Sequence, residues 1–347
     1  MSRRVESIDK LPGQNPSRLY KRNLNMSAPF QDLLGLEPLT AAQIEFILDQ
    51  SKPFQKFNAQ PLKKLATLRG KTVVLAFFEA STRTRVSFAT AAARLGADAM
   101  NLQAEASSLK KGESLLDTVN TLDAMKPDLF VMRHSSSGAP HMVADHLAIP
   151  VINAGDGMHE HPTQGLLDAL TIRDHKGRLD GLNVTILGDI RHSRVARSNI
   201  NLLSKFGARL TLCGPAMWVP REMEMVAPGV RVETNLRRAL DGAEVINVLR
   251  VQKERLNEPS LPIEDYILGY QLTPTLLRLA RPDAIVLHPG PMNRGLEIDP
   301  AVADGPQSVV KEQVTNGLAV RMALLFLMLA GVTTDDAPVV LKEAMGA

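Results

Sequence analysis

The sequence has few cysteines, few aromatic residues and no long uninterrupted apolar run. A single cysteine, Cys213, among 347 residues excludes an internal disulfide and a zinc site built from several thiolates. It lies in the apolar run 210–213, which predicts a buried strand residue. The apolar stretch 318–332 contains Arg321 and is too short for a membrane span, so it predicts a buried helix. We therefore expect a protein of a reducing, cytoplasmic compartment that makes no contact with a membrane.

Basic residues are unevenly distributed along the chain. The whole chain carries a formal net charge of +3, but residues 1–26 alone carry +4, so the remainder is slightly acidic. Aromatic residues make up only 4% of the chain, so platforms for base stacking are not expected. The composition argues against nucleic-acid binding, except through the basic first segment.

That first segment is polar and lacks the apolar core of a secretory signal. We interpret residues 1–27 as a mobile N-terminal extension. A mitochondrial presequence is the other interpretation, and Glu6 and Asp9 count against it. The sequence leaves open whether the extension mediates assembly or covers an active site.

Short apolar runs alternate with helical patterns along nearly the whole chain, which is typical of a parallel α/β architecture. A helix is predicted from Thr40, because Thr40 and Gln43 have the spacing of a capping box. A long helix is predicted from Pro162 to His175, and the alternation restarts after it. Strands are predicted at residues 72–77, 99–102, 128–132, 149–153, 184–187, 209–212, 230–233, 245–249 and 284–287. The fold class is therefore α/β, with two domains that each contain a mainly parallel sheet flanked by helices, linked by interdomain helices.

Residues 77–85 (FFEASTRTR) lie where a predicted strand ends and a helix begins. Free backbone N–H groups and the helix dipole favour an anion at such a place. Ser81, Thr82 and Thr84 add hydroxyl donors, and the Arg83 guanidinium suits a phosphate. The segment predicts a phosphate site, although its spacing alone also fits a hydroxyl-rich helix cap with solvated arginines.

The run 81–85, followed by Ser87-Phe88 and Leu95-Gly96, resembles the carbamoyl-phosphate motif of the aspartate/ornithine transcarbamoylase family. The resemblance extends over residues 30–335. Residues 131–134 are similar to the family's strand-end arginine segment, and residues 159–164 to its His-Pro-x-Gln motif. The resemblance implies that carbamoyl phosphate is bound by Ser81, Thr82, Arg83, Thr84, Arg133, His161 and Gln164. Its implied catalytic groups are Arg83, Thr84, Arg133 and His161.

Residues 107–114 (SSLKKGES) resemble the family's mobile loop, which reaches into the active site of a neighbouring subunit. The resemblance implies that Ser107 and Lys111 act there and that Lys111 contacts both substrates. A solvated basic turn is the alternative interpretation. A homotrimer follows from the resemblance, and partner chains of a regulatory or dihydroorotase-like kind are left open.

Residues 187–198 resemble the family's second-domain loop, with Arg194 on a substrate carboxylate. Residues 249–255 (LRVQKER) resemble the aspartate-specific motif, in which Arg250 and Gln252 bind the side-chain carboxylate. A solvated helix face is the alternative for this run.

Residues 288–295 (HPGPMNRG) resemble the loop that closes over the carbamoyl group. The resemblance implies that the carbonyl groups of Gly290 and Pro291 accept hydrogen bonds from the carbamoyl amide. A rigid Pro/Gly turn is the alternative.

Two other kinds of site are not expected. His159 and His161 flank Glu160, but Pro162 is predicted to open a helix, and no His-x-x-x-His pair is present there for a metal. Gly188 is the only glycine of its loop, so a dinucleotide cofactor is not expected. We expect neither a metal nor a cofactor.

The resemblance implies that the carbamoyl group passes from carbamoyl phosphate to the amine of L-aspartate, an early step of pyrimidine synthesis. In the ornithine enzymes of the family, cysteines typically occupy the positions of Thr163 and Pro289. Arg194 and Arg250 suit a dicarboxylate substrate such as aspartate. The alternative from a different class of function is a catalytically inactive member of the family that serves as an oligomeric scaffold. The implied domains are residues 28–162 for carbamoyl phosphate, with a helix near 308–332 packing back on it, and residues 163–307 for aspartate.

Overall fold

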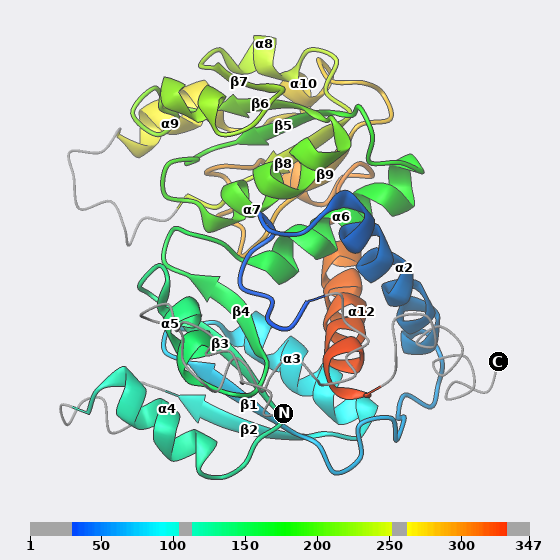
Figure 1. The fold of residues 1–347 in the computed structure, drawn as a ribbon. Helices are drawn as coiled ribbons and strands as arrows, with labels where there is room; N and C mark the ends of the chain where they lie inside the picture. The colour runs from blue at the N-terminus through cyan, green and yellow to red at the C-terminus, as the bar shows by residue number, and fades with distance from the viewer. Residues whose placement is uncertain (1–29, 104–112, 252–261, 332–347) are drawn as a thin grey trace, which may run out of the picture.

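Two parallel β-sheets organise the chain, one in each half of the sequence (Figure 1). The structure, a computed structural model, describes residues 30–103, 113–251 and 262–331. The extension predicted over residues 1–27 lies outside the described residues. The predicted α/β fold class is confirmed, because the named strands of both sheets pair in parallel and helices flank them.

The first sheet has the strand order β2-β1-β3-β4. Its strands are β1 (Thr72–Phe77), β2 (Asp98–Gln103), β3 (Leu129–His134) and β4 (Val151–Asp156). The helices between them are α3 (Thr82–Leu95), α4 (Leu115–Asp123) and α5 (Ala139–His146). Strands β3 and β4 run beyond their predicted ends, because His134 pairs with Asp156 at the end of the ladder.

The second sheet has the strand order β7-β6-β5-β8-β9. Its strands are β5 (Asn183–Leu187), β6 (Arg209–Cys213), β7 (Val230–Glu233), β8 (Val245–Val248) and β9 (Ile285–Leu287). The helices of this half are α7 (Arg194–Leu203), α8 (Leu236–Leu240), α9 (Ile263–Tyr270), α10 (Pro274–Leu277) and α11 (Pro300–Ala303), with 3-10 turns η4 (Ser204–Phe206) and η5 (Arg221–Met225). Cys213 is buried in β6, as predicted.

Three long helices pack against one another near the junction of the two halves (Figure 1). Helix α2 (Ala41–Asn58) begins at the predicted capping box of Thr40 and Gln43. Helix α6 (Pro162–Lys176) contacts β4 on one side and α7 and β9 on the other (Figure 1). Helix α12 (Val310–Leu329) packs against α2, α3 and α6, and most of its side chains are buried, as its apolar sequence predicts.

The carboxyl ends of several strands meet between the two sheets. Glu79, just after β1, contacts Arg133 at the end of β3 and Arg194 at the start of α7, the helix that follows β5. Ligands of open parallel sheets bind outside the carboxyl ends of the strands, so this junction is where a site is expected. Within the described residues, no helix is long and apolar enough to cross a membrane.

Candidate active site

The predicted phosphate segment forms the first turn of α3. Ser81 is the N-cap residue, and Thr82 is the first residue of the helix. Thr82 and Arg83 are exposed and Ser81 is half-buried, whereas Thr84 is buried at 8% exposure. Hydroxyl groups, a guanidinium and the helix N-terminus therefore share one accessible place, a combination that favours a bound phosphate.

Arg83 connects this turn with the loop after β9. A Cβ atom on Gly290 would lie 1.9 Å from Nη1 of Arg83, so the guanidinium packs directly on the glycine. Gly290 also has a φ of +63°, a conformation that L side chains rarely adopt. Partial desolvation of its guanidinium, followed by the charge of Arg250, lowers the pKa of Arg83, so these two cations lie near each other.

Glu79 lies between arginines from the two halves. Its Oε1 accepts hydrogen bonds from Nη2 of Arg133 at 3.0 Å and from Nη2 of Arg194 at 2.7 Å. Nη1 of Arg194 donates to Oε2 at 3.1 Å. Burial opposes ionisation of Glu79, but Arg194 and Arg133 outweigh it and lower the pKa of the carboxyl. No function was predicted for Glu79, although an acidic residue directly after a strand and shortly before Arg83 and Arg85 was a usable signal.

His161 is the N-cap residue of α6 and is only 4% exposed. Its backbone N–H donates to Oγ of Ser198 at 2.8 Å. Burial, followed by the charges of Arg133, Arg194 and Arg321, lowers the pKa of His161 well below its ordinary value. The imidazole is therefore neutral and has one N–H to donate among several guanidinium groups.

Gln164 is held by a buried carboxylate one turn further along α6. Its Nε2 donates to Oδ1 of Asp168 at 2.9 Å, which turns the side-chain oxygen away from Asp168. Asp168 also accepts hydrogen bonds from Gln313 at 2.7 Å and Asn199 at 2.9 Å. Burial raises the pKa of Asp168 to about 6, even though these amide donors favour the carboxylate.

Hydrogen bonds between residues of the loop after β9 fix its conformation. The Gly290 N–H donates to Nδ1 of His288 at 2.7 Å, and Nε2 of His288 lies 3.1 Å from Oε1 of Glu297. Nδ2 of Asn293 donates to the carbonyl of Val251 at 3.0 Å, which ties this loop to the segment that follows Arg250.

The structure thus brings together predicted residues that lie far apart in the sequence. They are Arg83, Arg133, His161, Arg194, Arg250 and Gly290. Ser107, Lys111 and Gln252 lie outside the described residues. Glu160 is turned toward α7, where Oε2 accepts from Ser198 at 2.8 Å, so it does not join His159 and His161 around a common point.

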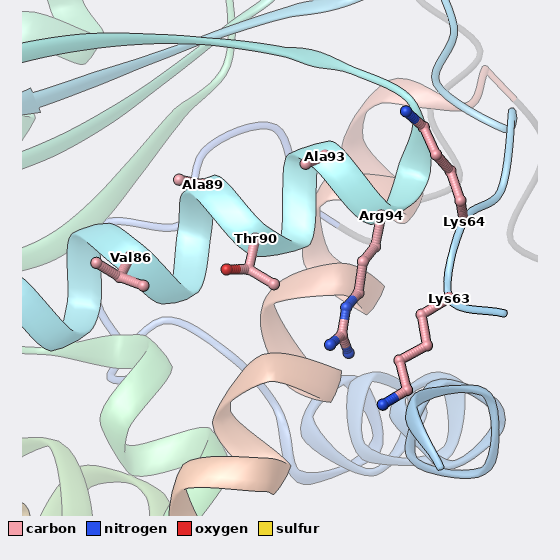
Figure 2. A pocket seen from close by; sticks show the side chains of 7 residues that line it. All are labelled: Lys63, Lys64, Val86, Ala89, Thr90, Ala93 and Arg94. Carbon is pink, nitrogen blue, oxygen red and sulfur yellow. The ribbon is translucent and has the colours of Figure 1, made fainter. Parts of the chain in front are cut away.

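A surface hollow of about 480 Å³ lies elsewhere, along the outer face of α3 (Figure 2). Three basic and four small or apolar residues line it: Lys63, Lys64, Val86, Ala89, Thr90, Ala93 and Arg94. None of them is a residue predicted to bind either substrate.

Comparisons with known proteins identify the family of this chain. A family model described as "Aspartate/ornithine carbamoyltransferase, carbamoyl-P binding domain" matches residues 31–174, and "Aspartate/ornithine carbamoyltransferase, Asp/Orn binding domain" matches residues 180–328. The aspartate carbamoyltransferase catalytic subunit of Solibacter usitatus is 60% identical over 84% of this chain and 97% of its own length. That of Syntrophotalea carbinolica is 53% identical over 90% of this chain and 99% of its own length.

Solved structures give the same fold. Aspartate transcarbamoylase of Trypanosoma cruzi, in complex with carbamoyl aspartate and phosphate, matches with a TM-score of 0.80, 31% identity, and coverage of 88% of this chain and 98% of that chain. Ornithine carbamoyltransferase of Pyrococcus furiosus matches with a TM-score of 0.78, 30% identity, and coverage of 87% and 98%. The backbone alone therefore does not separate the two activities, whereas the sequence identities favour the aspartate enzymes. The chain belongs to the aspartate/ornithine carbamoyltransferase family.

Proposed function

We propose that this chain transfers the carbamoyl group of carbamoyl phosphate to the amine of L-aspartate, giving N-carbamoyl-L-aspartate and phosphate. One observation carries the proposal: guanidinium groups from both halves converge on the buried, neutral His161 and on the first turn of α3. Both substrates are anions, and a site that holds two anions together needs positive charge on both sides.

In this proposal the first half binds carbamoyl phosphate. Ser81, Thr82 and the N–H groups of α3 hold the phosphate together with Arg83. Thr84, Arg133 and His161 donate to the carbonyl oxygen, and neutral His161 does so without adding a further cation. The carbamoyl amide donates to Gln164 and to the carbonyl groups of Gly290 and Pro291.

The second half binds aspartate through Arg194, Arg250 and Gln252. A guanidinium has five N–H donors, and Arg194 uses three of them for Glu79 and the carbonyl of Gly157. The remaining donors allow Arg194 to hold a substrate carboxylate while Glu79 fixes its orientation.

The chemistry then needs no enzyme nucleophile. The aspartate amine attacks the carbamoyl carbon, and the departing phosphate takes the amine proton. The residues contribute by placing the two anions within reach and by stabilising the developing oxyanion, for which one lost donor typically costs about 10²–10³ in rate.

We further propose that Ser107 and Lys111 act in the site of a neighbouring copy, within a homotrimer. Support comes from the sequence 107–114, which matches the family's shared loop. We expect the enzyme to work in the cytoplasm.

Formation of the ureido product tests the function, with L-aspartate and L-ornithine compared at matched concentrations. We expect activity with aspartate alone and loss of aspartate saturation in Arg250→Ala. Arg294→Ala is the matched control, since Arg294 pairs with Asp304 on the surface. Activity with ornithine alone would contradict the roles given to Arg194 and Arg250.

A further inference from the structure

Two imidazoles and a carboxylate lie together beside the loop that leads into α6. His141 is in the first turn of α5, Asp156 is the last residue of β4, and His159 follows three residues later. One ligating atom from each of these residues lies within 4.8 Å of the other two. Across residues 30–103, 113–251 and 262–331, only this trio brings three such groups together.

Asp156 is fixed before any ligand arrives. Its carboxylate is fully buried and accepts hydrogen bonds from Gly138 N–H at 2.7 Å, Asn153 Nδ2 at 2.7 Å and Glu160 N–H at 3.1 Å. Nδ1 of His159 lies 3.1 Å from both of its oxygens. The carboxylate therefore holds the His159 imidazole beside it, so both groups are positioned before an ion binds.

The rings of His141 and His159 lie edge-to-face, and solvent reaches His159. Their ring centroids are 5.3 Å apart with an interplanar angle of 70°. The side chain of His159 is 36% exposed. An ion can therefore reach the imidazoles from solution without opening the fold.

We propose that His141, Asp156 and His159 form a site for a divalent transition-metal ion such as Zn²⁺, with water completing its coordination. Zinc–nitrogen bonds of about 2.0–2.1 Å set tetrahedral ligands about 3.4 Å apart. The three ligand atoms lie within 4.8 Å of one another, so they need to approach by at most about 1.4 Å to reach that spacing. Two nitrogen ligands disfavour Mg²⁺ and Ca²⁺, which take oxygen ligands.

A second histidine–carboxylate pair in the chain shows what makes this trio different. Nδ1 of His192 lies 3.0 Å from Oδ1 of Asp189, with the same three-residue spacing. Such a pair alone only fastens a loop, and in the described part of the chain no second imidazole joins it. His141 is therefore the residue that turns a loop contact into a metal site.

Calorimetry with ZnCl₂ tests the site, using untagged full-length protein in a buffer without phosphate or chelators. We expect one Zn²⁺ per chain, with affinity at least about tenfold weaker in His141→Ala and in His159→Ala. His175→Ala, at the exposed end of α6, is the matched control and should bind as wild type does. Cys213 is buried, so a thiol does not compete for the ion.

Two further readouts keep the test decisive. Co²⁺ bound to the wild type should show visible absorption bands that are lost in His141→Ala, while carbamoyl transfer by that variant stays unchanged and shows that it folds. Absence of Zn²⁺ binding by the wild type, or equal affinity in His141→Ala, would overturn the proposal. Neither result would affect the function proposed above, since none of the three residues is assigned to a substrate.

Discussion

Glu79 joins the two halves of the site through a single carboxylate. We expect Glu79→Gln to lower the free energy of unfolding by about 1–3 kcal/mol, because two partly buried guanidiniums lose their charged partner. We also expect a lower kcat/KM for aspartate, since Arg194 loses its orientation. Urea unfolding and steady-state kinetics measure the two effects.

Asp304→Asn is the control for Glu79→Gln. Asp304 forms a two-point contact with Arg294, at 2.6 and 2.8 Å, but both side chains are exposed. An exposed pair contributes about 0–1 kcal/mol, so the control should be nearly neutral. Equal effects of the two substitutions would refute the bridging role of Glu79.

Gly290 leaves the space that the Arg83 guanidinium occupies. We expect Gly290→Ala to raise the KM for carbamoyl phosphate and to reduce kcat by about 10²–10³, because the new methyl group displaces Arg83. Gly295→Ala is the control: Gly295 has a φ of +82° but nothing within 4 Å of the added Cβ. If both variants lose activity equally, backbone strain rather than the position of Arg83 is responsible.

Asp168 predicts a pH dependence of stability. Its pKa is raised from 3.8 to about 6 in the folded chain, so folding favours the protonated form. The stabilising effect of this proton is complete below about pH 4 and is lost as the pH rises through about 6. Between pH 4.5 and 7.5, wild type should therefore lose more unfolding free energy than Asp168→Asn, which has no such titration. Urea unfolding at both pH values checks this, and parallel pH profiles would contradict it.

At the scale of elements, strong local patterns predicted helices and strands well. Helix α2 begins at its capping box, α6 begins at Pro162, and α12 is buried, as predicted. The end of β4 was missed, because Ala-Gly-Asp has low strand propensity and only pairing with His134 extends the strand. The short helices α5 and α8 to α11 were not predicted, since four to eight residues carry too little periodicity.

For the candidate site, too, the sequence predicts what depends on local motifs and does not predict contacts between distant segments. Motifs indicated Arg83, Arg133, His161, Arg194 and Arg250 because each motif is local in sequence. The contact of Arg83 with Gly290, and that of Glu79 with Arg194, join segments more than 100 residues apart. No pattern within one segment specifies them, and only the packing of both sheets does.

At the scale of the whole molecule, the proposed sharing of the site between subunits predicts complementation. Arg83→Ala and Lys111→Ala should each be nearly inactive, and refolding them together should restore part of the activity, because some mixed oligomers then contain one intact site. Activity assays before and after mixing measure this, with wild type refolded in parallel. If the mixed variants regain no activity although wild type survives the same refolding, Lys111 does not act across subunits.

The single buried cysteine gives this molecule an internal reporter. Burial, with the charge of Glu233, raises the pKa of the Cys213 thiol to about 12, so thiol reagents find almost no thiolate in the native chain. Labelling therefore requires that the second sheet open and expose β6. The labelling rate, measured with and without aspartate, would report how often the aspartate-binding half opens, and no engineered probe is needed.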